Sequence, residues 1–337
     1  MVQSYPTNQL KLPSFSIVVE TENLSTAEME GLTHCLDTLA AQDVSPTDAN
    51  EVLIIETGDL PTDLIDRLQT HYPWLTVQRI ESSIDYYEAK MKGFSFTTGE
   101  VLVLCDSDCV YEPGWLKNLL VPFAEKAEIQ VVAGETRISP LGAYGLAMAL
   151  TYIFPPFSQR QELSQSHSYF CNNVAFRRSF LLSHPIPANL PIYRGNCTVH
   201  ACYLTEQGYV IWNQPQSRAV HAAPNGLSHF FWRFLLLGFD ALTVARLQRR
   251  SGGQLNVNLL DDLRACVGIG VWKLKQVVLR TGALLSDDPT RIWLLPLAVP
   301  IALTSLLLFF SGLMIGYVSP TYLLKKYSQV EARLEHV

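Results

Sequence analysis

Two carboxylates one residue apart, Asp106 and Asp108, are the side chains whose type and spacing most directly indicate chemistry. They follow Val101–Leu104, a β-branched and leucine run typical of a strand buried on both faces. Ligands of open α/β sheets bind at the carboxyl ends of such strands. Alternate residues of an extended segment share a face, so both carboxylates could hold one cation, and oxygen ligands suit Mg²⁺ or Mn²⁺ with attached phosphate. A solvated turn is the competing interpretation, which the preceding buried strand disfavours.

The elements that must position this pair alternate between strands and helices. Strands are predicted at Phe15–Glu20, Glu51–Ile55, Leu75–Ile80 and Val101–Leu104, with helices at Ser25–Ala40, Leu64–His71 and Tyr86–Phe96 between them. This alternation predicts the α/β class, with a mostly parallel sheet and helices on both faces.

Composition narrows the classes of function. The chain has 337 residues and a net charge of −6, which argues against a nucleic-acid partner. Its seven cysteines form no CxxC pair and no Cys/His zinc spacing, as expected of reduced thiols in a reducing compartment. No signal peptide is apparent in the polar N-terminal residues, so we expect the N-terminal domain to be cytoplasmic.

The C-terminal third has a different character. Residues 226–290 combine apolar runs with arginines and lysines, which predicts amphipathic helices at a membrane interface, with core helices as the alternative. Residues 291–318 are almost uncharged and long enough for a tilted transmembrane helix, or for a re-entrant segment because of Pro296 and Pro300. Residues 319–337 form a polar tail. The expected location is the cell membrane, with the catalytic domain cytoplasmic.

The motifs between residues 14 and 225 resemble those of the family 2 glycosyltransferases, which have the GT-A fold and use nucleotide-sugars. Asp106-Ser107-Asp108 matches the DxD motif of that family, and Tyr111–Leu116, which contains Pro-Gly-Trp-Leu, matches the segment that follows it. The resemblance therefore implies a GT-A domain over residues 14–225.

The resemblance also implies a set of site residues. Those expected to bind the donor nucleotide and its phosphates are Glu20, Thr21, Glu22, Glu56, Lys90 and Asp106. Those expected to hold Mg²⁺ or Mn²⁺ are Asp106, Asp108 and His221.

One departure from the family pattern concerns the general base. Asn196-Cys197 stands where inverting members carry Glu-Asp, and neither residue is an evident base. Three explanations are open. His200 or Glu135 takes the role; the enzyme needs no such base, as in retaining GT-A enzymes; or the protein binds a nucleotide-sugar without transferring it.

The function implied is metal-dependent transfer of a hexose from a UDP- or GDP-sugar to an acceptor hydroxyl. The expected membrane location favours a lipid acceptor, and no nucleic acid is expected as partner. The alternative is a catalytically inactive GT-A membrane protein that acts as a nucleotide-sugar-binding or scaffold module.

Overall fold

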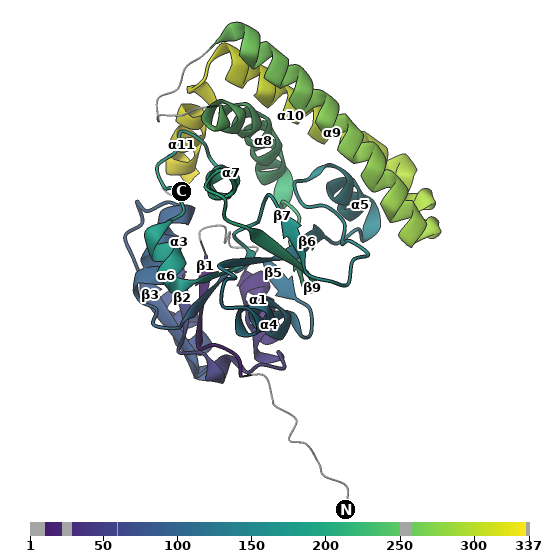
Figure 1. The fold of residues 1–337 in the computed structure, drawn as a ribbon. Coiled ribbons are helices and arrows are strands. Elements are labelled where there is room, and N and C mark those ends of the chain that lie inside the picture. Colours follow the sequence, from purple (N-terminus) through teal and green to yellow (C-terminus); the bar gives the residue numbers. More distant parts are fainter. Residues whose placement is uncertain (1–10, 22–28, 59, 250–257, 335–337) are drawn as a thin grey trace, which may run out of the picture. The chain divides into compact units, whose positions relative to one another are not determined.

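The computed structural model describes residues 11–21, 29–58, 60–249 and 258–334 (Figure 1). The chain divides into two compact units. The first contains residues 1–135, 159–185 and 204–219, and the second contains residues 136–158, 186–203 and 220–337.

The first unit is built on a mixed sheet. Its strands are β1 (Phe15–Glu20), β2 (Glu51–Glu56), β3 (Leu75–Arg79), β4 (Val101–Asp106), β5 (Cys109–Tyr111), β6 (Val131–Ile138), β7 (Ser164–Ser166), β8 (Asn173–Arg177) and β9 (Ile211–His221). They lie in the order β3-β2-β1-β4-β8-β6-β9-β5, with β7 paired to β9. Strands β1 to β4 are parallel, whereas β8 is antiparallel to both β4 and β6. The predicted α/β class is confirmed, and the sheet, predicted to be mostly parallel, is parallel among β1 to β4 and antiparallel at β8 and between β7 and β9.

Helices follow the strands of the first unit as the alternation predicts. They are α1 (Met29–Ala40), α2 (Thr62–His71), α3 (Tyr86–Ser95), α4 (Trp115–Glu125) and α6 (Arg178–Ser183), with a 3₁₀ turn at Pro46–Asp48. The part of the predicted first helix before residue 29 lies outside the described residues. Apolar residues of β1, β2 and β4, fully buried on both faces, pack against α1 and α4 to form the core.

The Pro-Gly-Trp segment has a structural explanation. Gly114 caps α4 with φ of 78°, a left-handed conformation that glycine adopts without strain. Trp115 begins the helix fully buried, and its Nε1 donates to Asn173 Oδ1 of β8 at 2.8 Å. The hydrogen bond of Trp115 therefore links the start of α4, which follows the two carboxylates, to strand β8 of the sheet.

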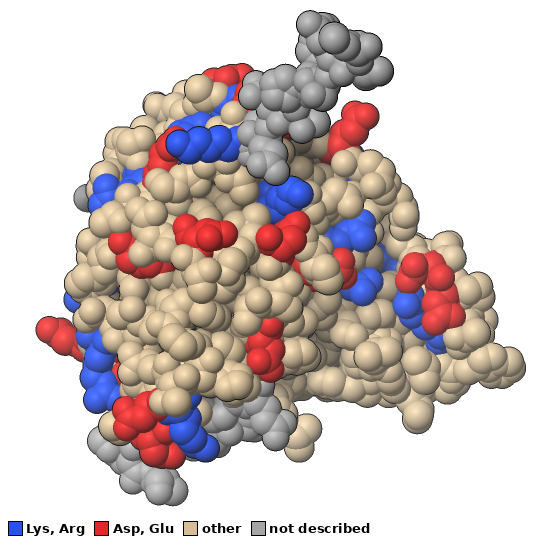
Figure 2. Space-filling model, turned by 90° about the horizontal axis from the view of Figure 1, so that it is seen from below, with Lys and Arg blue, Asp and Glu red and all other residues tan. Residues whose placement is uncertain are grey.

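The second unit is mainly helical. Its helices are α5 (Gly142–Thr151), α7 (Asn196–Glu206), α8 (Gly226–Gln248), α9 (Leu259–Asp287), α10 (Leu295–Val318) and α11 (Tyr322–Leu334), with a 3₁₀ turn at Pro289–Leu294. α7 continues into the first unit at residue 204. Pro289–Val318 is, among the described residues, the one helical stretch long and apolar enough to cross a membrane. On the face visible in Figure 2, acidic and basic side chains are interspersed.

Candidate functional site

The carboxylate of Asp106 lies buried at the carboxyl end of β4, where the sequence places it. Glu20, also buried, is its neighbour in register at the end of β1. Residues 107 and 108 then form a turn that leads into β5. Asp106 and Asp108 therefore do not share the face of one extended segment, because the chain reverses between them.

Helix α3 brings two side chains to Asp106. Asp85 caps the helix by accepting from the N–H groups of Tyr87 and Glu88 at 3.0 and 2.9 Å. Tyr86 and Lys90 are four residues apart and so project from one face of the helix. The Tyr86 hydroxyl lies 2.8 and 2.9 Å from the two Asp106 carboxylate oxygens, and Lys90 Nζ lies 2.6 Å from Oδ1.

Close packing holds this helix face against the sheet. A Cβ added to Gly93 would lie 2.6 Å from Ile55 Cγ1 and 2.8 Å from Val18 Cγ1, so the position has no room for a side chain. Glycine thus lets the α3 backbone approach β1 and β2 closely enough for Lys90 to reach the end of β4.

The opposite charges of Lys90 and Asp106 stabilise each other inside the protein. Burial alone would lower the pKa of Lys90, but the charges of Asp106 and Glu20 outweigh it, so the pKa is raised and the ammonium stays charged. Lys90 Nζ also donates to the carbonyl of Cys105 at 2.6 Å. Lys90 is thus placed to orient Asp106; direct contact with a diphosphate stays a prediction. Sequence reasoning missed Tyr86, although its four-residue spacing from Lys90 was a usable signal.

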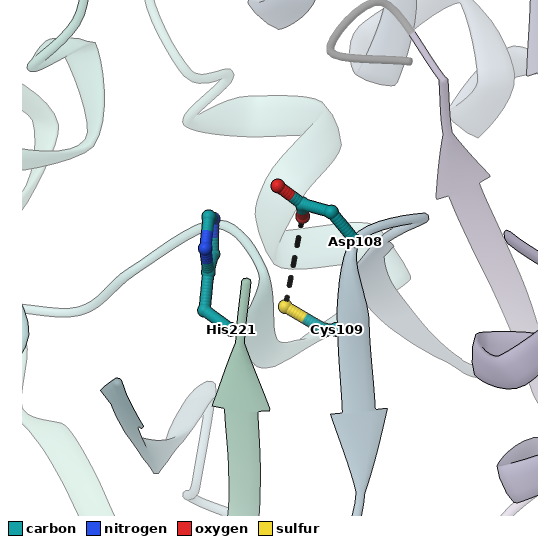
Figure 3. Close-up of side chains that lie close together, drawn as sticks. All are labelled: Asp108, Cys109 and His221. Atoms are coloured by element: carbon teal, nitrogen blue, oxygen red, sulfur yellow. Dashed lines mark hydrogen bonds between the residues drawn. The ribbon is translucent and has the colours of Figure 1, made fainter. Parts of the chain in front are cut away.

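A second group of side chains contains Asp108. The possible ligand atoms of Asp108, Cys109 and His221 lie within 4.8 Å of one another (Figure 3). Cys109 Sγ donates to Asp108 Oδ1 at 3.9 Å, and burial raises the pKa of the Cys109 thiol well above its usual range. His221 is the last residue of strand β9. Its Nδ1 lies 2.6 Å from the carbonyl oxygen of Ala222, so in this contact Nδ1 is the donor.

The residues expected at the nucleotide are already engaged in the fold. Glu56 Oε1 accepts from the N–H groups of Gly58 and Leu60, and Oε2 accepts from Arg79 Nε at 2.7 Å. Thr21 Oγ1 donates to the carbonyl of Ile55 at 3.0 Å. Glu22 lies outside the described residues. Glu56 and Thr21 thus fix the edge where β1 and β2 end, and contact with a nucleotide stays a prediction for both.

The two candidate bases belong to different units. Glu135 is a half-buried residue of β6 in the first unit, and Asn213 Nδ2 lies 3.4 Å from its Oε1. His200 lies buried within α7 in the second unit. Asn196, at the position of the missing carboxylates, begins α7 and donates from Nδ2 to the carbonyl of Pro187 at 2.7 Å.

Comparison with known proteins defines the class of this domain. Residues 24–183 match the family model described as "Glycosyl transferase family 2", and the chain has the GT-A fold of the solved glycosyltransferases to which it is similar. The predicted resemblance is confirmed. None of the curated proteins compared with the sequence matches it.

Two solved structures illustrate the likeness. The mannosyltransferase PcManGT from Pyrobaculum calidifontis, in complex with GDP-Man and Mn²⁺, is 16% identical with a TM-score of 0.58, over 92% of this chain and 88% of that one. GalNAc-T7 with UDP, GalNAc and Mn²⁺ is 17% identical with a TM-score of 0.52. That match covers 63% of this chain and 43% of GalNAc-T7, so the chain spans less than half of that protein.

Proposed function

We propose that the protein transfers a sugar from a nucleoside-diphosphate sugar to an acceptor hydroxyl, with the help of a divalent metal ion. The observation that carries this proposal is the pairing of two features where β4 ends: the buried Lys90–Asp106 ion pair and the neighbouring Asp108, Cys109 and His221 group. In both solved relatives described above, the complex contains Mn²⁺ with UDP or GDP-Man.

The donor set fits Mg²⁺ or Mn²⁺. Asp108 offers carboxylate oxygens and His221 offers an imidazole nitrogen, and such ions accept both types of ligand. Cys109 offers a thiol sulfur, a soft donor atom that suits hard ions poorly. We therefore assign Asp108 and His221 as metal ligands, with Asp106 oriented beside them. When bound, the metal would stabilise the charge on the departing nucleoside diphosphate.

The other residues of the proposed sugar-donor site contribute through where they lie. Lys90 and Tyr86 fix the Asp106 carboxylate, so that it needs no reorganisation when a donor arrives. Glu20, Thr21 and Glu56 stand at the ends of β1 and β2, the edge where α/β sheets bind ligands, and Glu22 follows them in the sequence. We propose this edge as the nucleotide subsite, with a UDP- or GDP-hexose as donor.

For the acceptor proton, we propose Glu135 or His200 as general base. The half-buried carboxylate of Glu135 is able to take a proton from an acceptor hydroxyl at an oxygen atom. His200 would take it at a ring nitrogen. Asn196 at the family's carboxylate position is the observation that favours the alternative, an inactive nucleotide-sugar-binding or scaffold module.

We propose a lipid or membrane-associated acceptor and a membrane location, with the catalytic domain facing the cytoplasm. The support is the apolar stretch Pro289–Val318, which is long enough to anchor the chain. A lipid acceptor would share the membrane with such an anchor.

The test is release of nucleoside diphosphate from a panel of UDP- and GDP-hexoses, with lipid extract as acceptor source, in Mn²⁺, Mg²⁺ or chelator. We expect turnover with one donor, lost with chelator and in Asp108→Asn. Glu135→Gln and His200→Gln separate the two candidate bases, because only the true base should be required. Saturable donor binding without turnover by any donor would establish the binding-module alternative instead.

A further inference from the structure

Helices α9 and α10 of the second unit form an antiparallel hairpin (Figure 1). The Tyr317 hydroxyl near the end of α10 lies 3.5 Å from the carbonyl of Leu259 at the start of α9. The 3₁₀ turn Pro289–Leu294 joins the other ends. With 29 and 24 residues, the helices extend for roughly 43 and 36 Å at 1.5 Å per residue.

The polarity of α9 is the reverse of that in a helix of a water-soluble protein. Its buried residues include the charged Asp262, Lys273 and Arg280. Its exposed residues include Val271 and Val278, whose side chains are 64% and 71% exposed. A helix that faces water buries its apolar stripe and exposes its charges. Here the outward stripe is apolar. Of the three charged residues between 265 and 286, Lys273 and Arg280 are buried and Lys275 is exposed.

The buried basic side chains of α9 donate hydrogen bonds to backbone carbonyls of the second unit. Lys273 Nζ donates to the carbonyl of Thr151 at 2.5 Å. Arg280 donates to the carbonyls of Tyr152 and Ile153 at 2.6 and 3.1 Å. These carbonyls end α5, where the helix dipole places partial negative charge. The cations thus cap α5 on the inner side of the hairpin and leave the outer side free for apolar groups.

Helix α10 continues the apolar surface. Leu303 and Leu307 on its outer side are 56% and 68% exposed. Its opposite side is covered by protein: Ser305 Oγ donates to Thr151 Oγ1 of α5 at 2.9 Å, and Gly312 packs directly on the backbone of α8 at Leu235. Buried positions run along this side from Ala298 to Gly316. Only one side of α10 is therefore open to lipid.

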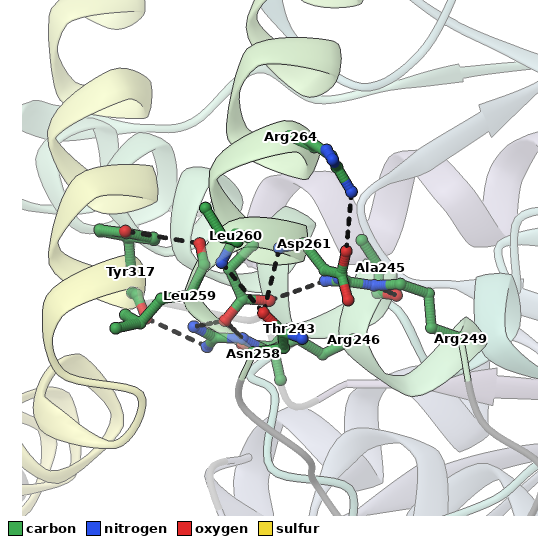
Figure 4. Close-up of polar contacts among 12 residues, drawn as sticks. Thr243, Ala245, Arg246, Arg249, Asn258, Leu259, Leu260, Asp261, Arg264 and Tyr317 are labelled. Atoms are coloured by element: carbon green, nitrogen blue, oxygen red, sulfur yellow. Dashed lines mark hydrogen bonds and ion pairs between the residues drawn. The ribbon is translucent and has the colours of Figure 1, made fainter.

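Both ends of the hairpin carry charged and polar groups. At the open end, the exposed side chain of Arg264 pairs with Asp261 at 3.4 Å, within the polar cluster of Figure 4. At the turn, Arg291 pairs with Asp287 at 2.8 Å. Such groups suit the headgroup region that flanks an apolar surface.

We infer that the α9–α10 hairpin lies in the plane of a membrane, with its outer face among the lipid chains of one leaflet. The outer face is formed by Val267, Val271, Val278, Leu303, Leu307 and Met314. A crossing hairpin would place its inner side in the bilayer core as well, but α5 covers part of that side and is only ten residues long. Ten residues extend about 15 Å, half of the hydrocarbon core. This inference is independent of sugar transfer.

One test is co-flotation of the full-length protein with phosphatidylcholine vesicles that contain a minority of phosphatidylglycerol. The double variant Val271→Glu and Leu303→Glu should lose roughly tenfold or more in vesicle affinity, because each charge would enter the acyl region. Both positions are exposed, so the fold should tolerate the change. Lys117→Glu on α4 of the first unit is the control, because it changes the net charge by the same amount at an exposed position outside the hairpin, and it should stay bound. Unchanged binding of the double variant would overturn the inference.

A second test distinguishes an in-plane hairpin from a crossing one. Ser286→Cys at the turn and Leu260→Cys at the open end are introduced separately into a Cys202→Ser background. Each is then treated with a membrane-impermeant maleimide on sealed vesicles that carry the protein outside. An in-plane hairpin predicts labelling at both ends without detergent. Labelling of one end only after detergent would show a crossing hairpin. Failure to bind vesicles, with dimers lost in the double variant, would assign the face to a second copy of the chain.

Discussion

Lys90 Nζ lies 2.6 Å from Asp106 Oδ1, and both side chains are buried at the carboxyl end of β4. A buried charge is stable only when it is paired, so the two residues depend on each other. The pair joins α3 to the strand that carries the metal motif. It therefore links the stability of the first unit to the geometry of the donor site.

Replacement of Lys90 by methionine should destabilise the protein by about 3–5 kcal/mol, because the Asp106 carboxylate would remain buried without its cation. Urea unfolding measures this loss. Lys92→Met on the same helix, at a partly exposed position, should change stability by only about 0.5 kcal/mol. Equal effects of the two substitutions would contradict a special role for Lys90.

Asp108→Asn should weaken Mn²⁺ binding while the fold persists, because Asp108 is half-exposed in a turn and not in the core. The loss of metal affinity should exceed the roughly 10–100-fold typical for a residue that only supports a ligand. Titration calorimetry with Mn²⁺ and thermal unfolding measure the two quantities. Cys109→Ser is the comparison, and it should retain metal affinity if the thiol is not a ligand.

Asp240 of α8 predicts a pH dependence of stability. Burial raises the pKa of Asp240 to about 7, although the N–H groups of Tyr193 and Arg194 donate to its oxygens. The native state then binds more protons than the unfolded state between pH 4 and pH 7. The contribution of protonated Asp240 to the free energy of unfolding is therefore full at low pH. It is lost as the pH rises through the folded pKa, and the total loss is on the order of 4 kcal/mol.

The free energy of unfolding at pH 5 and pH 8 tests this sign. Asp240→Asn cannot ionise, so its stability should fall less than that of the wild type over this interval. Asp261→Asn, at a partly exposed position of α9, should follow the wild type. A wild-type protein whose stability rises between these pH values relative to Asp240→Asn would refute the argument.

Gly238 and Gly312 let α8 and α10 approach backbone to backbone. A Cβ at Gly238 would overlap the carbonyl of Phe309, and one at Gly312 would overlap the carbonyl of Leu235. Gly238→Ala should therefore destabilise the protein by about 1–3 kcal/mol or more through overpacking. At Gly268 in α9, an added Cβ would have no neighbouring atom within 4 Å outside its own helix backbone. Gly268→Ala should therefore be neutral or stabilising by up to about 1 kcal/mol. Thermal unfolding in detergent compares the two.

The sequence by itself determined the class of the fold and the centre of the site. Buried β-branched strands that alternate with amphipathic helices specify a parallel sheet, because side-chain period and burial are local properties. For the same reason Asp106 could be placed at the end of β4. The Pro-Gly-Trp segment and the apolar stretch before residue 318 were also visible as local patterns.

Only the tertiary structure decided what each charged side chain contacts. Lys90 was predicted to support a diphosphate, which stays a prediction, and the structure adds its contact with Asp106, because Gly93 lets α3 approach the sheet. The lysines and arginines of α9 predicted only that the helix is amphipathic, and the structure places Lys273 and Arg280 against the end of α5. Sequence spacing fixes which residues share a helix face, but it does not say whether that face meets protein, water or lipid.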